Sequence, residues 1–267
     1  MNDSNFSRGL ENLNFIEKRE VPSIIAALAD IAPDLARLTV KFVYGEIYSR
    51  PGLSRRYRQL ATISALVVLG NAQPQLKFHI NAALNIDIPP SEVIETLIHI
   101  ASYAGFPASL NGVSVAREVF SQRQLLPMEY GNPQAAEFRS EDRYQKGWAA
   151  LTEIDGEVGI RIIDSLKDIA PDLARFIIEF AFGDIYTRPE LDLLSREITT
   201  VAALTAMGNA RPQLKVHING LLNVGGSKIQ LIETIIHTAV YAGFPAAINA
   251  MFSAQEVLEE RMSDTST

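Results

Sequence analysis

The sequence predicts an all-α fold made of two homologous helical-bundle units in one chain. Residues 30–120 align without a gap on residues 168–258. In each copy the apolar residues recur with a period near 3.6, as on one face of a helix. No clear alternation of apolar and polar residues between hairpin turns is present, as strands would require. These three observations favour two helical bundles over a fold that contains a sheet.

Proline and glycine residues mark the ends of the expected helices. Pro33 and Pro74 suit the first turn of a helix, where a backbone N–H is not needed. Gly70 and Gly105 suit helix ends, because glycine adopts the left-handed conformation at low cost. In the first unit we expect helices at about 22–30, 33–48, 55–70, 74–85, 91–104 and 107–122. The repeat places equivalent helices in the second unit.

The repeat divides the chain into two units and a linker. We expect the units at 1–126 and 143–267, joined by a linker at 127–142 that is rich in proline, glycine and charge. The runs ATISALVVL (61–69) and TTVAALTAM (199–207) are apolar on nearly every face. Helices of this kind are buried on all sides, so we expect the two units, or several subunits, to pack around them.

Composition excludes several classes of protein. The net charge is −7, so we expect neither a nucleic-acid partner nor a membrane surface, which need clustered lysine and arginine. The 267 residues include no cysteine, which rules out disulfides, thiolate metal sites and thiol nucleophiles. The sequence has no secretory signal and no apolar run of about 18 residues, so we expect a cytoplasmic protein. A small anionic ligand stays compatible with one or two local cations.

Common cofactor and metal motifs are absent from the sequence. It has no G-x-G-x-x-G or Walker A loop, no H-E-x-x-H pair and no G-x-S-x-G nucleophile elbow. We therefore expect a protein that uses neither a metal nor an organic cofactor.

Two of the four histidines lie in nearly identical stretches of eleven residues. The stretches NAQPQLKFHIN (71–81) and NARPQLKVHIN (209–219) share nine of eleven residues and carry His79 and His217. Histidine is suited to proton transfer near neutral pH. Each of the two flanks the apolar face of its helix. A catalytic histidine and a core histidine satisfied by one hydrogen bond are both compatible with this position.

The polar residues around these two histidines differ between the units. Glu197 follows Arg196 at the start of the second apolar helix, and Arg211 precedes His217. A carboxylate at this place can relay protons, or it can be a first-turn charge favoured by the helix dipole. The first unit has Gln59 where the second has Glu197, and Gln73 where the second has Arg211. Because glutamine cannot ionise, chemistry that needs these charges favours the second unit.

Further candidates recur in both units. Arg188 can clamp a carboxylate, or it can cap the C-terminus of a helix. His99 with Tyr103, and His237 with Tyr241, are spaced by four residues and so share a helix face. A packed hydrogen-bonding pair is a simpler interpretation of that spacing than catalysis.

These residues resemble the carboxymuconolactone decarboxylase family. The shared features are the R-E before the apolar helix, the glycine at its end, the L-K-x-H-I run and the Y-A-G-F-P turn. The resemblance implies an all-α bundle that assembles into rings. Because single-unit relatives are hexamers, it implies a homotrimer with six pseudo-equivalent units. Thiol peroxidases of the same superfamily use a C-x-x-C pair, so the lack of cysteine excludes that activity here.

The resemblance implies a cofactor-free decarboxylase that acts on a small carboxylated lactone, such as 4-carboxymuconolactone, in aromatic-compound degradation. By this resemblance His217 is the proton donor and Glu197 sets its protonation, with His79 as a further catalytic candidate. We assign substrate binding to Arg196, Arg211, Tyr241 and Arg188. Two alternatives stay open: a non-catalytic ring protein that binds a small molecule or is structural, and a lactone isomerase or hydrolase.

Overall fold

The computed structural model describes residues 4–127 and 140–264, and every regular element in these two ranges is a helix. The first unit contains α1 (Ser4–Glu17), α2 (Ser23–Leu28), α3 (Pro33–Leu38), the π-helix η1 (Thr39–Ile47), α4 (Arg55–Leu69), α5 (Gln73–Asn85) and α6 (Pro90–Gln122). The second unit contains α7 (Ser140–Leu166), α8 (Pro171–Phe176), the π-helix η3 (Ile177–Tyr186), α9 (Leu193–Met207), α10 (Arg211–Asn223), α11 (Lys228–Ala242) and α12 (Phe244–Asp264). The predicted all-α fold is confirmed.

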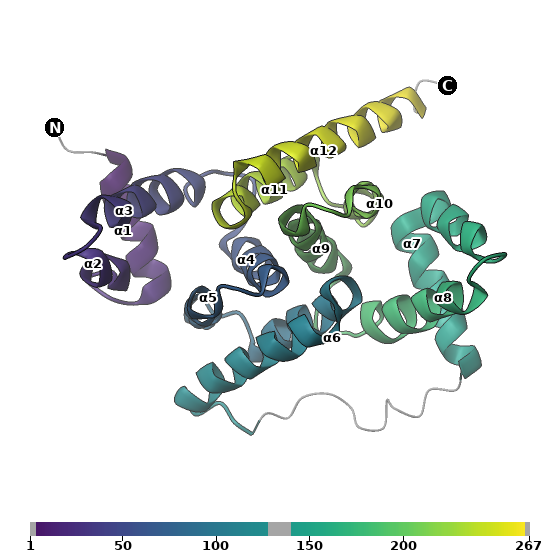
Figure 1. Ribbon diagram of the computed structural model, residues 1–267, viewed down its shortest axis with the longest axis horizontal. Helices are drawn as coiled ribbons and strands as arrows, with labels where there is room; N and C mark the ends of the chain where they lie inside the picture. The colour runs from purple at the N-terminus through teal and green to yellow at the C-terminus, as the bar shows by residue number, and fades with distance from the viewer. Residues whose placement is uncertain (1–3, 128–139, 265–267) are drawn as a thin grey trace.

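The two apolar helices lie side by side at the centre of the molecule (Figure 1). Helices α4 and α9 pack on each other across the boundary between the units. Leu60 and Ile63 of α4, and Ile198 and Val201 of α9, are fully buried. Burying each such side chain contributes about 1.5–3 kcal/mol. The expectation that the two units pack around these helices is confirmed.

The units also exchange helices at their edges. In the first unit α6 packs on α9 and η3, and in the second unit α11 packs on α4 and η1. A helix of one unit therefore reaches the central helix of the other in both directions. This exchange places side chains from both units at each of two equivalent positions.

Each unit holds its π-helix through a close crossing with its first long helix. A Cβ atom on Gly9 of α1 would lie 2.1 Å from the backbone oxygen of Val40, and one on Gly147 of α7 would lie 1.9 Å from that of Ile178. Only glycine permits so close an approach. The crossings of α1 with η1 and of α7 with η3 thus fix the start of each π-helix, and Tyr48 and Tyr186 stand at the opposite end.

The observed helices differ from the prediction in two places. The helix expected at 33–48 is α-helical only to Leu38 and π-helical from Thr39, and α1 was not among the expected helices. The helices expected at 91–104 and 107–122 form α6, which is interrupted at Gly105 with φ 81° and ψ 163°. The predicted interruption of the helix at Gly105 is therefore present, and the chain continues as a helix directly after it.

The predicted linker at 127–142 falls mostly on residues 128–139, which lie outside the described residues, and α7 already begins at Ser140. Within the two described ranges, none of the helices has both the length and the apolar character needed to cross a bilayer.

Candidate active site

His217 of α10 and Glu197 of α9 form a buried hydrogen-bonded pair. Nδ1 of His217 lies 3.0 Å from Oε2 of Glu197. The Glu197 side chain is fully buried, and the His217 side chain is 8% exposed. Because a carboxylate can only accept, Nδ1 carries the proton and Nε2 is left to act on a ligand. The structure thus brings together the two residues that the sequence analysis proposed for proton transfer.

Two tyrosines complete a chain of hydrogen bonds that ends on the carboxylate. The hydroxyl of Tyr186, at the end of η3, donates to Oε1 of Glu197 at 2.6 Å. The hydroxyl of Tyr103, from α6 of the first unit, lies 2.6 Å from that of Tyr186. The Tyr103 ring also meets the imidazole of His217 edge to face, with centroids 5.1 Å apart. Both carboxylate oxygens are therefore held, and the site is built from both units.

Burial and the carboxylate act in opposite directions on the pKa of His217. Burial lowers the pKa, because it disfavours the charged imidazolium. The neighbouring charge of Glu197 and its hydrogen bond outweigh burial, and Asp155 acts in the same direction, so the pKa is raised above its usual value. His217 can therefore carry a transferable proton near neutral pH.

Asp155 is a buried carboxyl group that sequence reasoning missed. It lies in α7 just before Gly156, whose φ of 57° interrupts the helix. Asp155 is 6% exposed, and its Oδ1 has no hydrogen-bond partner in the part of the chain that the structure describes. Burial raises its pKa to about 6, with His217 opposing and Glu197 reinforcing the shift. An Asp-Gly pair inside a helical pattern is a break signal that could have pointed to it.

The equivalent site of the first unit has a similar histidine contact, but a neutral amide replaces the carboxylate. Nδ1 of His79 lies 2.9 Å from Oε1 of Gln59, and Nε2 lies 3.4 Å from the hydroxyl of Tyr241. That hydroxyl is in turn 3.1 Å from the hydroxyl of Tyr48. Burial lowers the pKa of His79 to about 3. His79 is therefore a neutral, satisfied histidine at physiological pH.

Tyr241 and Tyr103 serve the unit to which they do not belong. Tyr241 was assigned to substrate binding in the sequence analysis, and the structure places it against His79, with ring centroids 5.4 Å apart. Beside His217 the equivalent position is occupied by Tyr103. The exchange of α6 and α11 between the units is the physical reason.

Arg196 and Arg188 bind Glu95 of α6. Nη2 of Arg196 lies 3.0 Å from Oε2 of Glu95, and Nε of Arg188 lies 2.6 Å from Oε1. Arg196 is fully buried. The other unit repeats the arrangement, with Arg50 and Arg58 on Glu233. The guanidinium of Arg196 is buried and held by Glu95 of the other unit, so it joins the two units, and its assignment to substrate binding stays a prediction.

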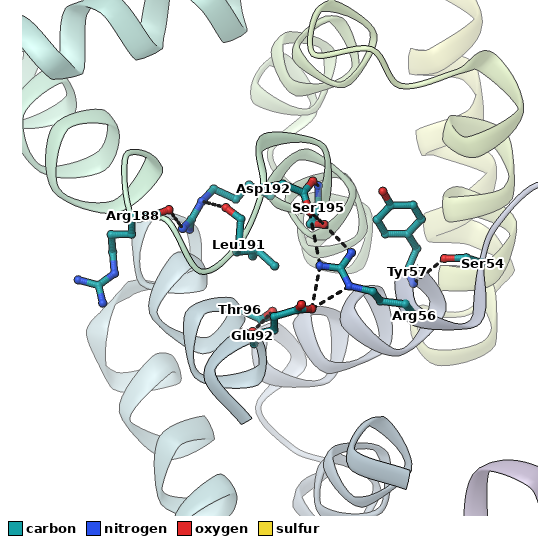
Figure 2. Close-up of polar contacts among 10 residues, drawn as sticks. Ser54, Arg56, Tyr57, Glu92, Thr96, Arg188, Leu191, Asp192 and Ser195 are labelled. Carbon is teal, nitrogen blue, oxygen red and sulfur yellow. Dashed lines mark hydrogen bonds and ion pairs between the residues drawn. The ribbon is translucent and has the colours of Figure 1, made fainter. Parts of the chain in front are cut away.

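Arg56 fixes the start of α9 from the other unit (Figure 2). Nε of Arg56 donates to Oε2 of Glu92 at 2.8 Å, and Nη1 donates to Oγ of Ser195 at 2.8 Å. Asp192 caps the first turn of α9 by accepting from the backbone N–H of Ser195 at 2.8 Å. Because Glu197 follows two residues later, these contacts help to position its carboxylate.

Arg211 is separated from the His217 pair. It is the first residue of α10, six residues before His217 and so about 9 Å along the helix. Its side chain is 60% exposed and pairs with Glu256 of α12. In residues 4–127 and 140–264 no cluster of three or more His, Asp or Glu side chains is arranged to hold a metal ion.

Comparisons with known proteins agree with the presence of two homologous units in the chain. The Carboxymuconolactone decarboxylase family matches residues 33–118 and 171–256, one match in each unit. The 4-carboxymuconolactone decarboxylase of Acinetobacter baylyi is 37% identical over 121 residues, which are 45% of this chain and 90% of that protein. The nitrosuccinic acid decarboxylase of Metarhizium robertsii is 32% identical over 84 residues, which are 32% of this chain and 58% of that protein.

One solved structure has the same fold along nearly the whole chain. It is a Burkholderia xenovorans protein described as a gamma-carboxymuconolactone decarboxylase subunit. The TM-score is 0.58 and the sequence identity 23%, over 97% of this chain and 98% of that chain. The matched family segments include both duplicated histidines, so the two sites lie in the shared part of the fold.

Proposed function

Because the chain belongs to the carboxymuconolactone decarboxylase family, we propose that it is a cofactor-free decarboxylase acting on a small carboxylated lactone. The observation that carries the proposal is the buried pair of His217 and Glu197, with Nδ1 of the imidazole held and Nε2 left for the substrate. Two relatives named above are decarboxylases of small carboxylated molecules, which supports the reaction class.

The reaction needs a place for an electron pair and a source of one proton. When the bond between carbon and the carboxylate breaks, carbon dioxide leaves and the electron pair moves into the unsaturated lactone as an enolate. The enolate carbon next to the lactone carbonyl then takes up a proton, which we assign to Nε2 of His217, and the ring double bond shifts to give an enol-lactone. A positioned acid of this kind contributes about 10²–10⁴-fold to the rate.

The surrounding groups keep His217 protonated and oriented. Glu197 accepts from Nδ1, and the hydroxyl of Tyr186 holds the other carboxylate oxygen, as described above. Asp155, with a pKa raised to about 6, exchanges protons close to neutral pH, and we assign it the role of a proton reservoir for His217. A histidine with a raised pKa beside a carboxyl group that titrates near pH 6 is suited to repeated proton delivery.

The test is carbon dioxide release from 4-carboxymuconolactone by the wild-type chain and by Glu197→Gln. This substitution copies the pair of the first unit into the second. We expect wild-type turnover and a loss of about 10²-fold in the variant, with unchanged helical circular dichroism. Absence of turnover with any carboxylated lactone would contradict the proposal and favour a non-catalytic ring protein.

We also propose that the chain assembles as a homotrimer of six pseudo-equivalent units. Equivalent apolar side chains are exposed in both units, which supports burial against further copies of the chain: Ile31 and Ile169, Leu35 and Leu173, Phe106 and Phe244, and Leu110 and Ile248. Sedimentation equilibrium should give three times the chain mass of 29.4 kDa. A monomer at micromolar concentration would contradict this assembly.

A further inference from the structure

A pocket of about 340 Å³ lies where the end of α9, the start of α10 and the first half of α12 meet. Its lining includes Thr205, Arg211 and Ser253, and it includes neither His217 nor Glu197. Thr205 follows Glu197 by eight residues on α9, a rise of about 12 Å along the helix. The pocket is therefore separate from the proposed active site.

The hydroxyl of Thr205 is buried and unpaired. Thr205 is 1% exposed, and its Oγ1 has no hydrogen-bond partner among the described parts of the chain. Native proteins leave few buried hydroxyls without a partner, because such a group has lost its bonds to water and gained none. Thr205 lines the pocket, so a rotation of its side chain would let a ligand bound there supply the missing partner.

The start of α10 borders the same pocket through Arg211, its first residue, whereas the second residue, Pro212, has no N–H to donate. This helix has 13 residues, and its N-cap residue, Ala210, provides no side-chain cap. The N–H groups of a first helical turn lack partners within the helix, and the helix dipole favours negative charge beside them. Nε of Arg211 donates to Oγ of Ser253 at 3.3 Å, which holds the guanidinium at the pocket. These donors fit an anionic ligand rich in acceptors.

Glu256 of α12 competes for the guanidinium. Arg211 donates to Oε1 of Glu256, and Nζ of Lys215 lies 3.1 Å from Oε2 of the same carboxylate and 3.1 Å from Glu260. The side chains of Arg211 and Glu256 are 60% and 42% exposed. Exposed ion pairs are weak, so an incoming carboxylate can exchange with Glu256 while Lys215 keeps Glu256 paired.

The first unit provides an internal comparison. Its equivalent pocket has a volume of about 20 Å³ and is lined by Val67 and Gln73 where the second unit has Thr205 and Arg211. Position 115 is valine where the second unit has Ser253. The same helices are therefore stable without these polar groups. Ser253 donates to the backbone oxygen of Asn249 and Arg211 pairs with Glu256, so among these groups it is the buried hydroxyl of Thr205 that the described residues leave without a partner.

We propose that this pocket binds a small organic carboxylate. The charged group contacts Arg211, the hydroxyl of Thr205 and the first turn of α10, and the apolar body contacts Leu214 and Phe252, which also line the pocket. This assignment goes beyond the proposed function, because it gives the chain a second ligand site away from His217.

The test is isothermal titration of the full chain with benzoate, which has a carboxylate and an apolar body, and with benzamide, its neutral counterpart. We expect saturable binding of one benzoate per chain. Benzamide should bind at least about tenfold more weakly. Equal binding of the two compounds, or no binding of benzoate, would overturn the proposal.

Variants locate the bound benzoate. Arg211→Gln and Thr205→Val, which copy the first unit, should each weaken binding about tenfold, and Glu256→Gln should tighten it. Gln73→Ala in the first unit and His217→Ala should leave it unchanged. If His217→Ala abolishes binding and Arg211→Gln does not, benzoate occupies the active site and the pocket proposal fails. If binding depends on Arg211 while no lactone is turned over, the pocket stands and the proposed decarboxylase function fails.

Discussion

The imidazole of His217 and the carboxylate of Glu197 are joined by a hydrogen bond of 3.0 Å, and the same chain contains the uncharged counterpart of this pair. In the first unit an amide, Gln59, takes the place of the carboxylate at 2.9 Å from His79. The histidine therefore meets a carboxylate in one unit and a neutral amide in the other. The pKa of His217 is raised, whereas that of His79 is lowered to about 3.

Replacing Glu197 with glutamine should lower the pKa of His217, because burial is then opposed only by the charge of Asp155. Titration of the imidazole protons by NMR measures this shift. The reverse change, Gln59→Glu, is the matched control and should raise the pKa of His79. Unchanged titration of both histidines would show that the carboxylate does not control them.

The same substitution should change how stability depends on pH. The folded-state pKa of His217 lies above the unfolded value of about 6.5. The stabilisation of the folded state by the pair of His217 and Glu197 is therefore fully present below about pH 6.5. It is lost as the pH rises through the raised folded-state pKa. In urea unfolding, the stability advantage of the wild type over Glu197→Gln should therefore be larger at pH 6 than at pH 9.

The hydroxyl of Tyr103 should matter for turnover, because it is the outermost donor of the chain that reaches Glu197 through Tyr186. We expect Tyr103→Phe to slow lactone decarboxylation about tenfold, as the loss of one hydrogen bond to a catalytic network does. Tyr241→Phe removes the equivalent hydroxyl beside His79 and should leave turnover unchanged. Equal effects of the two variants would contradict the asymmetry of the sites.

Gly220 makes room for the carboxylate of Glu197. A Cβ atom at this position would lie 2.7 Å from Oε2 of Glu197, and the first unit has Ala82 at the equivalent position. Because Tyr186 and His217 hold both carboxylate oxygens, we expect Gly220→Ala to displace Glu197, lower the pKa of His217 and slow turnover about tenfold. Ala82→Gly is the control. Full activity of Gly220→Ala would show that the carboxylate has freedom to move.

Asp155 should destabilise the folded state at neutral pH, although we assign it a role in proton transfer to His217. Its folded-state pKa of about 6 exceeds the ordinary value of 3.8, so stability falls as the pH rises from about 4 to 6. Asp155→Asn should remove this dependence and raise the free energy of unfolding by about 3 kcal/mol above pH 6, as measured by urea unfolding. It should also lower the pKa of His217. Glu17→Gln, the equivalent change in the first unit, is the control.

The sequence predicted the helices better than the site. Helix α4 was expected at 55–70 and spans Arg55–Leu69, because Gly70 ends it with φ 70°. The π-helix η1 was missed, since apolar spacing near 3.6 does not distinguish a hydrogen bond to the fourth residue from one to the fifth. The backbone preferences of glycine and proline set the ends of helices, and the positions of these residues can be read from a single sequence.

The site depends on contacts between the units, which a single sequence does not reveal. His217 and Glu197 were found because they are polar residues in apolar, duplicated settings. Tyr103 was not placed beside His217, because that contact exists only through the packing of α6 on α9 and η3. The pairing of Arg196 with Glu95 depends on the same interface.

We propose that the second unit holds the working site and that the first unit holds its neutral counterpart. The most direct test compares carbon dioxide release from 4-carboxymuconolactone by His217→Ala and by His79→Ala, with folding checked by circular dichroism. We predict that His217→Ala loses about 10²–10⁴-fold in turnover and that His79→Ala keeps wild-type turnover. Wild-type turnover by His217→Ala, or an equal loss in both variants, would contradict the claim.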